Sequence, residues 1–300
     1  MNLIEEIKQL KAERNAVILA HNYVRPELQE IADFTGDSLE LSIKAKNVKA
    51  ETIVFCGVRF MAETAKLLSP DSVVLLPNPD AGCPMADMAA ADAVAAYRAA
   101  HPEAFLVAYV NTTADVKAHV DLCCTSGNAE KIIAELPENQ EILFLPDRNL
   151  GGNMNRKLDR KMDLWPGCCP THDHVTPEMI AEARAAHPGA KVLVHPECAP
   201  EVVAAADEAL STGGILKFVR ESFDKAFIIG TESGILHRLR KENPGKEFYP
   251  LQPEMICPDM KKITLENVRD CLKNMAPRIE LPEEILREAV KPIEAMIARS

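Results

Sequence analysis

"AVILAHNY", residues 16–23, is a short apolar run that ends in polar side chains, and two later stretches of the chain have the same form. They read AFLVAYVN at 104–111 and KVLVHPE at 191–197. Runs of this length and composition are typical of strands that a parallel sheet buries on both faces. The chain is therefore predicted to contain three related strands.

Each of these runs places two polar side chains near its carboxyl end, two positions apart. Residues two apart on a strand point to the same face of the sheet. In parallel sheets, ligands bind beyond the carboxyl ends of the strands, so each pair is well placed for chemistry. The three pairs are His21 with Tyr23, Tyr109 with Asn111, and His195 with Glu197.

The repetition extends beyond the strands with nearly constant spacing. The first members of the pairs, at positions 21, 109 and 195, lie 88 and 86 residues apart. A hydroxyl residue ahead of a helix-like stretch recurs at the same intervals, at 38, 126 and 212. A cysteine before proline closes each unit, at 83, 169 and 257. Several features that recur together at the same spacing indicate that the chain contains three copies of one unit.

Each unit reads as helix, strand, helical crossover, strand, helix and strand before the cysteine. This alternation predicts an α/β fold with short parallel sheets between helical layers. We expect three pseudo-threefold-related α/β/α sandwich domains around one central site. The predicted units are 1–83, 84–169 and 170–257. A helical extension at 258–300, assigned to the first unit, is predicted to contain helices at 264–275 and 283–298.

Composition narrows the class of protein. The net charge of −11 and the lack of a Lys/Arg-rich run argue against a nucleic-acid partner. No stretch approaches the roughly 18 apolar residues of a membrane span, so no membrane partner is expected. The first 15 residues have the pattern of a charged amphipathic helix without a signal-peptide core. The odd number of cysteines, nine, indicates thiols or metal ligands and a cytoplasmic protein.

The three Cys-Pro steps are candidate metal ligands, because rotation-related units would bring Cys83, Cys169 and Cys257 to one point. Three thiolates suit zinc or an iron–sulfur cluster. Structural zinc sites normally contain local Cys-x2-Cys pairs, which this sequence lacks. A cluster ligand in ferredoxin-type sequences precedes proline, which favours a [4Fe–4S] cluster. Three protein ligands leave one iron open to act as a Lewis acid.

The remaining cysteines have less defined roles. Cys168 lies 85 residues from Cys83 and Cys169 lies 86, so spacing alone barely separates them, and the proline that follows favours Cys169. Cys56 and Cys271 are interpreted as buried packing residues. Three more lie in predicted crossovers and stay undecided: Cys123, Cys124 and Cys198.

Glu197 is a candidate general base, because a carboxylate beside the imidazole of His195 in a closed pocket can accept a proton. The alternative is that Glu197 and His195 are capping or surface residues. Polar pairs at the same position in the other two units favour the functional interpretation. Tyr23 and Tyr109 offer hydroxyls, although a strand tyrosine more often packs with its hydroxyl in water. His172, close to the middle cysteine, is a candidate donor.

Ser38, Ser126 and Thr212 precede helix-like stretches, where a hydroxyl commonly caps the helix. Helix N-termini also bind anions through free N–H groups and the helix dipole. Three such ends at one centre would let an acidic protein hold a substrate with several negative charges.

Seven motifs are spread along nearly the whole chain: HNYVRPELQEIADFTGDSLELS, FCGVRFMAETAK, GCPMADM, YVNTTADVKAH, WPGCCPTH, HPEC and EMICPDMKKIT. Together they resemble the motifs of the quinolinate synthase family. The resemblance implies three α/β/α domains, a [4Fe–4S] cluster on three cysteines, and condensation of iminoaspartate (iminosuccinate) with dihydroxyacetone phosphate. The product would be quinolinate, with loss of phosphate and water, in de novo NAD biosynthesis. Transient contact with L-aspartate oxidase is implied on family grounds.

The resemblance also implies roles for individual residues. The cluster ligands would be Cys83, Cys169 and Cys257, since the family motif Trp-x-Gly-x-Cys-x-x-His makes Cys168 the variable position. The catalytic residues would be Glu197, Tyr23, His195 and Tyr109. The substrate would be bound by His21, Ser38, Tyr109, Asn111, Ser126, His172, His195, Glu197 and Thr212.

Two positions depart from the family pattern. The adjacent thiols Cys168 and Cys169 place a potential competitor beside the cluster. Glu254 stands where some members carry the first cysteine of a regulatory Cys-x-x-Cys pair, so that switch is not expected here.

Two other functions use the same cysteines. One is a zinc-dependent hydrolase with three thiolate ligands, and the other is a non-catalytic iron–sulfur sensor. Metal analysis distinguishes the first, and an accessible substrate cavity argues against the second.

Overall fold

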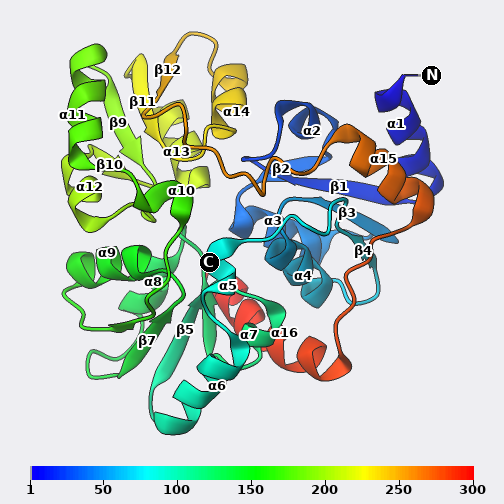
Figure 1. Cartoon of the computed structure of the whole chain (residues 1–300), viewed down its shortest axis with the longest axis horizontal. Helices are drawn as coiled ribbons and strands as arrows, with labels where there is room; N and C mark the ends of the chain where they lie inside the picture. Colours follow the sequence, from blue (N-terminus) through cyan, green and yellow to red (C-terminus); the bar gives the residue numbers. More distant parts are fainter. Residues whose placement is uncertain (1) are drawn as a thin grey trace.

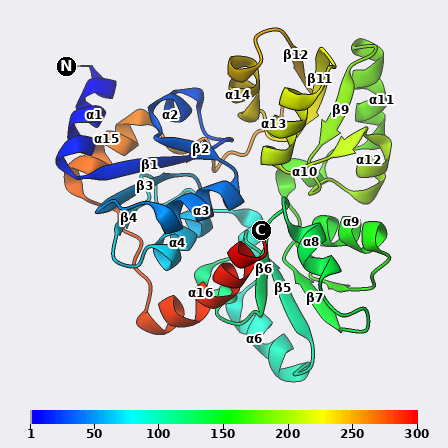
Figure 2. The same ribbon diagram turned by 180° about the vertical axis from the view of Figure 1, so that it is seen from behind.

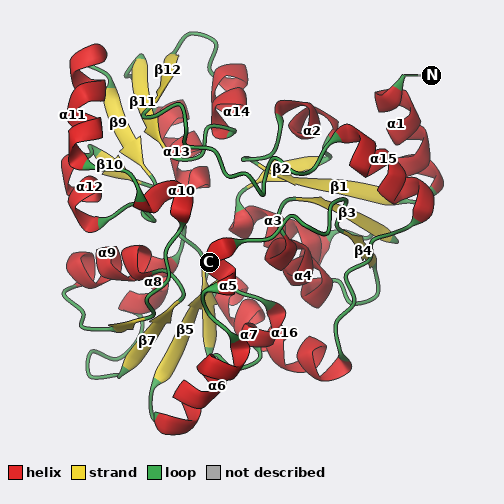
Figure 3. Ribbon diagram, in the orientation of Figure 1, coloured by secondary structure: helices red, strands yellow, loops and turns green. Residues whose placement is uncertain are grey.

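The computed structural model describes residues 2–300 and contains three four-stranded parallel sheets. The sheets share one strand order, in which the first strand of each unit lies between the second and the third. The orders are β2-β1-β3-β4, β6-β5-β7-β8 and β10-β9-β11-β12. Figure 3 shows each sheet flanked by helices in its own lobe of the molecule. The predicted α/β class with three parallel sheets is confirmed.

The strands have closely matching positions in the three units. The first sheet comprises β1 (Ala16–His21), β2 (Phe34–Gly36), β3 (Thr52–Cys56) and β4 (Val73–Leu75). The second comprises β5 (Phe105–Tyr109), β6 (Leu122–Cys124), β7 (Ile142–Leu145) and β8 (Asp163–Leu164). The third comprises β9 (Lys191–Val194), β10 (Glu208–Ala209), β11 (Ala226–Gly230) and β12 (Glu247–Pro250).

Each unit has four strands, where the sequence predicted three. The additional strands, β2, β6 and β10, lie in the crossovers and contain only two or three residues, too few for a hydrophobic period to reveal. An aspartate beside each short strand accepts a hydrogen bond from a backbone N–H of the first strand, and these aspartates lie 88 and 86 residues apart. The pairs are Asp33 with Ile18 (2.8 Å), Asp121 with Leu106 (2.8 Å) and Asp207 with Val192 (2.7 Å).

The helices complete the sandwiches. The first unit has α1 (Leu3–Glu13), α2 (Pro26–Ile31), α3 (Ser38–Asn47) and α4 (Arg59–Leu68). The second has α5 (Pro84–Asp87), α6 (Ala91–Ala100), α7 (Ala114–Lys117), α8 (Ala129–Ala134) and α9 (Arg148–Leu158). The third has α10 (Pro170–Asp173), α11 (Pro177–Ala186), α12 (Pro200–Ala205), α13 (Thr212–Glu221) and α14 (Ile235–Glu242). None of the helices within 2–300 combines the length and apolar composition that a membrane crossing requires.

The C-terminal extension forms α15 (Leu265–Asn274) and α16 (Glu283–Ala298), close to the predicted helices. Helix α15 contacts α1, whereas α16 contacts α4 of the first unit and both α7 and β6 of the second. Figures 1 and 2 show α16 between these two lobes, with the C-terminus near the middle of the molecule. There Asn128 Nδ2 donates to Ser300 Oγ at 2.8 Å. The extension therefore joins two units, and the unit boundaries remain predictions.

Candidate functional site

The carboxyl ends of β1, β5 and β9 open on one cavity, whose lining comes from all three units. The cavity contains about 690 Å³ of space outside the protein atoms. Every residue predicted for the site lies on its wall, although the role of each remains a prediction. These residues are His21, Tyr23, Ser38, Cys83, Tyr109, Asn111, Ser126, Cys169, His172, His195, Glu197, Thr212 and Cys257.

The two strand-end histidines have the same hydrogen-bonding arrangement. His21 Nδ1 accepts from the backbone N–H of Tyr23 at 3.2 Å, and His195 Nδ1 accepts from that of Glu197 at 3.3 Å. Burial lowers the pKa of His21 to about 3, with His195 acting in the same direction. Burial also lowers the pKa of His195 to about 4, against the opposing effect of Glu197. Both imidazoles are therefore neutral near pH 7, with Nε2–H as the available donor.

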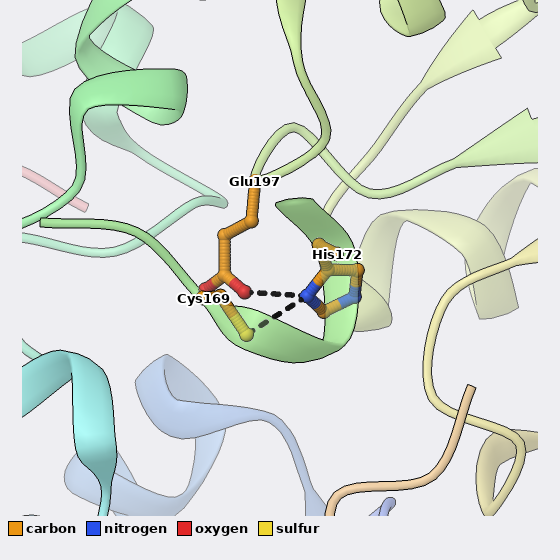
Figure 4. Close-up of side chains that lie close together, drawn as sticks. All are labelled: Cys169, His172 and Glu197. Atoms are coloured by element: carbon orange, nitrogen blue, oxygen red, sulfur yellow. Dashed lines mark hydrogen bonds and ion pairs between the residues drawn. The ribbon is translucent and has the colours of Figure 1, made fainter. Parts of the chain in front are cut away.

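Glu197 lies at the centre of the polar groups. Its Oε1 accepts from the Tyr109 hydroxyl at 2.5 Å, and its Oε2 is 2.8 Å from His172 Nδ1 (Figure 4). Burial alone would raise the pKa of Glu197, but the imidazoles of His195 and His172 and the hydrogen bonds bring it well below its usual range. Burial and the nearby carboxylate raise the pKa of Tyr109 well above its usual value. The site thus holds an ionised carboxylate beside a protonated phenol.

A chain of hydroxyl groups leads to Glu197 from the other side. Thr212 Oγ1 donates to Tyr23 Oη at 2.8 Å, and Tyr23 Oη is 2.6 Å from Thr231 Oγ1. Thr231 Oγ1 in turn lies 2.8 Å from His172 Nε2. If His172 donates from Nδ1 to Glu197, its Nε2 accepts from Thr231, and every donor in the chain then points toward the carboxylate. Thr231 was missed by the sequence analysis.

The helix N-termini correct one expectation. Ser38 and Thr212 are the first residues of α3 and α13 and do not cap them. The caps are Asp37, which accepts from Glu40 N at 3.0 Å, and Ser211, which accepts from Gly214 N at 3.1 Å.

In the second unit, Asn128 occupies the cap position of α8. Because other residues take the cap position in all three units, the three predicted hydroxyls do not cap these helices and instead line the cavity.

Two of the three Cys-Pro steps have a structural explanation, whereas Pro258 after Cys257 begins a turn that is not part of a helix. Cys83 and Cys169 occupy the cap positions of α5 and α10, and proline follows at the first helical position, where its missing N–H costs nothing. Burial raises the pKa of Cys83 to about 12, while the amide groups of Ala86 and Met85 act in the opposite direction. Burial also raises the pKa of Cys257, again opposed by backbone amides.

The spacing of these three thiols fits a cluster better than a single ion. Thiolates on one tetrahedral zinc ion would lie about 3.8 Å apart, because each Zn–S bond is about 2.3 Å. Within residues 2–300, the only Cys, His, Asp or Glu ligand atoms that gather in threes within 4.8 Å are those of Cys169, His172 and Glu197. The sulfurs of Cys83, Cys169 and Cys257 share the cavity, but the three do not all lie within 4.8 Å of one another. A multi-atom inorganic core can span such a separation.

The other cysteines lie away from the cavity wall. All nine cysteines are free, as predicted. Cys56 in β3 and Cys271 in α15 are buried in the core, and Cys168 contacts Arg148 and Asp173 outside the cavity. Cys123 and Cys124, in the crossover of the second unit, form part of the short strand β6. Cys198 is buried in the third unit.

A buried acidic residue positions the third Cys-Pro loop. Glu232 accepts from the backbone N–H of Cys257 at 3.2 Å and from that of Gly234 at 2.7 Å. Its carboxylate also pairs with Lys261 Nζ at 2.8 Å. Sequence analysis missed Glu232, which is the second residue after β11.

A second unexpected charged residue supports the Asn111 loop. Lys117 is completely buried, and its ammonium group donates to the carbonyl oxygens of Val110 (2.8 Å) and Thr112, on either side of Asn111. Burial lowers the pKa of Lys117 to about 8, while Cys123 and Glu63 act in the opposite direction. The lysine thereby fixes the backbone that presents Asn111 to the cavity.

Lys117→Met is expected to lower the free energy of unfolding by about 2 kcal/mol, because it leaves the buried Thr112 carbonyl without its donor. Urea unfolding of the metal-free chain measures this change. The matched control, Lys131→Met on the exposed face of α8, should change the value by less than about 0.5 kcal/mol. Equal unfolding midpoints for the two variants would show that the two carbonyls do not depend on the ammonium group.

Comparison with known proteins gives consistent matches along the chain. A family model described as "Quinolinate synthetase A protein" matches residues 5–298. The chain is 53% identical over 296 residues to the quinolinate synthase of Methanoregula boonei, covering 99% of this chain and 98% of that protein. It is 51% identical to the quinolinate synthase of Desulforudis audaxviator over 296 residues, with 99% and 98% covered. It is also 51% identical to that of Geobacter metallireducens over 294 residues, with 98% and 96% covered.

Proposed function

The chain belongs to the quinolinate synthase family, and from that premise we propose that it condenses iminoaspartate with dihydroxyacetone phosphate to quinolinate, releasing phosphate and water. The observation that carries the proposal is the composition of the central cavity. Three thiols, two neutral imidazoles and a carboxylate with its phenol and imidazole partners share one wall. This arrangement provides a metal-binding face and an acid–base face for one substrate.

Substrate binding needs donors for two carboxylates and a phosphate. His21 and His195 would donate from Nε2, because the backbone occupies Nδ1 of both. Asn111 and the hydroxyls of Ser38, Ser126 and Thr212 add neutral donors. The N-termini of α3 and α13 are joined where Gly213 N donates to Asp37 Oδ2 at 3.1 Å, and their free N–H groups favour anions.

Cys83, Cys169 and Cys257 would hold a [4Fe–4S] cluster. Their placement on one cavity wall, with one cysteine from each unit, supports this assignment. When bound, such a cluster supplies a Lewis acid at the iron that no protein ligand occupies.

The chain's own residues would move the protons. Glu197, ionised and held by Tyr109 and His172, accepts a proton from substrate carbon during isomerisation of the ketone intermediate to the aldehyde. Tyr23, whose pKa is raised by burial, stays protonated and can return a proton from the other side of the cavity. The hydroxyl of Thr231 connects Tyr23 with the His172–Glu197 pair.

Thr231→Val is expected to lower kcat by about 10-fold with a smaller change in KM, because valine matches the shape of threonine but leaves Tyr23 and His172 without their shared partner. Steady-state quinolinate formation measures both constants. Thr231→Ser keeps the hydroxyl and should retain most of the activity. If valine and serine behave alike, the hydroxyl has no part in turnover.

The two rival functions are less well supported. A zinc hydrolase on the three thiols is disfavoured by their separation. A sensor without catalysis would not need buried donors from three units around one cavity. The cytoplasmic location and the transient contact with L-aspartate oxidase remain predictions.

The test is purification without oxygen, followed by incubation with both substrates. The proposal predicts a brown protein with iron and acid-labile sulfide that forms quinolinate. A chelator-treated protein that takes up no cluster on anaerobic reconstitution with iron and sulfide, or a clustered protein that makes no quinolinate, would contradict it.

A further inference from the structure

We propose that the cluster-free chain binds one divalent metal ion, of the zinc type, between Cys169, His172 and Glu197. This site would be distinct from the cluster, because it uses one thiol, one imidazole and one carboxylate in place of three thiols. It does not depend on which reaction the loaded enzyme catalyses.

The ligand atoms already lie close together. Figure 4 shows the Cys169 sulfur and a Glu197 carboxylate oxygen on the same side of the His172 ring, facing Nδ1. Cys169 Sγ is 3.2 Å from His172 Nδ1, and Glu197 Oε2 is 2.8 Å from the same nitrogen. All three ligand atoms lie within 4.8 Å of one another. Ligand atoms on a tetrahedral zinc ion are about 3.3–3.6 Å apart, so small side-chain shifts would admit the ion.

Hydrogen bonds from neighbouring groups orient two of the three ligands. Thr231 Oγ1 lies 2.8 Å from His172 Nε2, and Tyr109 Oη donates to Glu197 Oε1 at 2.5 Å. Metal-bound histidines usually donate their second N–H to such a partner, and metal-bound carboxylates accept similar bonds. On metal binding, the imidazole proton moves from Nδ1 to Nε2, where Thr231 accepts it, and Cys169 loses its thiol proton.

The donor types and the open side of the group favour zinc. A thiolate, an imidazole and a carboxylate together suit a borderline ion such as Zn²⁺ better than Mg²⁺ or Ca²⁺, which prefer oxygen ligands alone. All three residues line the cavity, which leaves a fourth position for water. Three protein ligands and one water is the arrangement of zinc sites with an exchangeable position.

Such a site would compete with cluster assembly. Cys169 cannot bind both the ion and the cluster, and a metal-bound Glu197 is not available as a base. Zinc bound to the cluster-free chain is therefore expected to block reconstitution with iron and sulfide until a chelator removes it.

Co²⁺ serves as the spectroscopic probe, because a thiolate–cobalt bond absorbs in the near ultraviolet. The cluster-free double variant Cys83→Ala/Cys257→Ala cannot hold the cluster but keeps all three proposed ligands, so its band should match that of the wild-type chain. Cys169→Ala should lose the band, and His172→Ala or Glu197→Gln should weaken Co²⁺ binding by at least about 10-fold. Cys168→Ala is the matched control and should bind as wild type.

Loss of the band in the double variant while its circular dichroism stays native would overturn the proposal in favour of a three-thiolate site. Retention of the band in Cys169→Ala would overturn it as well. X-ray absorption at the zinc edge of the wild-type cluster-free chain provides a test without mutation. One sulfur and several nitrogen or oxygen neighbours support the proposal, and three sulfurs contradict it. None of these three outcomes affects the cluster assignment, which is judged on iron and sulfide.

Discussion

Alanine at Cys83, Cys169 or Cys257 is expected to remove the cluster and to lower activity by more than about 100-fold. Removing only a hydrogen-bonding partner of a metal ligand commonly lowers metal affinity or activity by 10–100-fold, so removing the ligand itself should lower them further. Iron content, acid-labile sulfide and the visible absorption of the anaerobically reconstituted protein measure the result. The same three substitutions should have equal effects, since each unit contributes one sulfur to the cavity wall.

Cys168→Ala is the control for these variants, because Cys168 precedes Cys169 directly but contacts Arg148 and Asp173 away from the cavity. It should keep its colour and its activity. Native circular dichroism for each variant separates loss of the ligand from loss of the fold. A colourless Cys168→Ala protein, or a Cys257→Ala protein with normal iron and sulfide, would disprove the assignment of ligands.

Glu197→Gln is expected to lower kcat by about 1,000-fold while iron and sulfide stay at wild-type levels. Glutamine keeps the shape of the side chain and can still accept from the Tyr109 hydroxyl, but it cannot take up a proton. General-base catalysis typically raises a reaction rate by 10²–10⁴-fold, and the expected loss of about 1,000-fold lies in the middle of that range. The measurement is steady-state quinolinate formation together with metal analysis of the same sample.

Glu201→Gln makes the same chemical change on the exposed face of α12, in the same unit, and should leave kcat unchanged. It controls for the altered net charge. Near-normal turnover by Glu197→Gln would remove the proposed base from the mechanism. Loss of the cluster from that variant would instead assign Glu197 a role in holding the metal.

The sheet ends and the cysteines could be predicted from sequence because the chain repeats them. A strand-end pair such as His195 and Glu197 is ambiguous alone, but its counterparts at Tyr109 and His21 have the same phase. Each pair lies at the carboxyl edge of its own sheet, and the three edges face the same cavity. The Cys-Pro steps recur in the same phase, and in two of them, at Cys83 and Cys169, proline is the first residue of a short helix that the cysteine caps.

Thr231 and Glu232 could not be found in this way, because polar residues do not recur at their positions in all three units. They are the first and second residues after β11, whereas Gly57 and Val58 follow the equivalent strand β3. Their importance depends on contacts with Tyr23 and Lys261, which are distant in sequence. Such contacts are visible only once the units are assembled.

The buried lysine illustrates a second limit. Lys117 is the last residue of the short helix α7. Lysine is a residue type that is normally exposed to solvent. Its burial depends partly on Phe60 from the first unit, whose ring lies 5.6 Å from the ammonium group. The spacing of apolar residues in the sequence predicts which face of a single helix or strand is buried. The burial of Lys117 arises from packing between two units, which that spacing does not reveal.

The central claim is that three sulfurs from three units hold one cluster with an iron left open to the substrate cavity. Mössbauer spectroscopy of the ⁵⁷Fe-reconstituted wild-type protein, before and after addition of quinolinate, tests it most directly. The account predicts a [4Fe–4S] spectrum in which one iron site alone changes when the ligand binds. A spectrum without a cluster, or one in which no iron responds to saturating ligand, would contradict it.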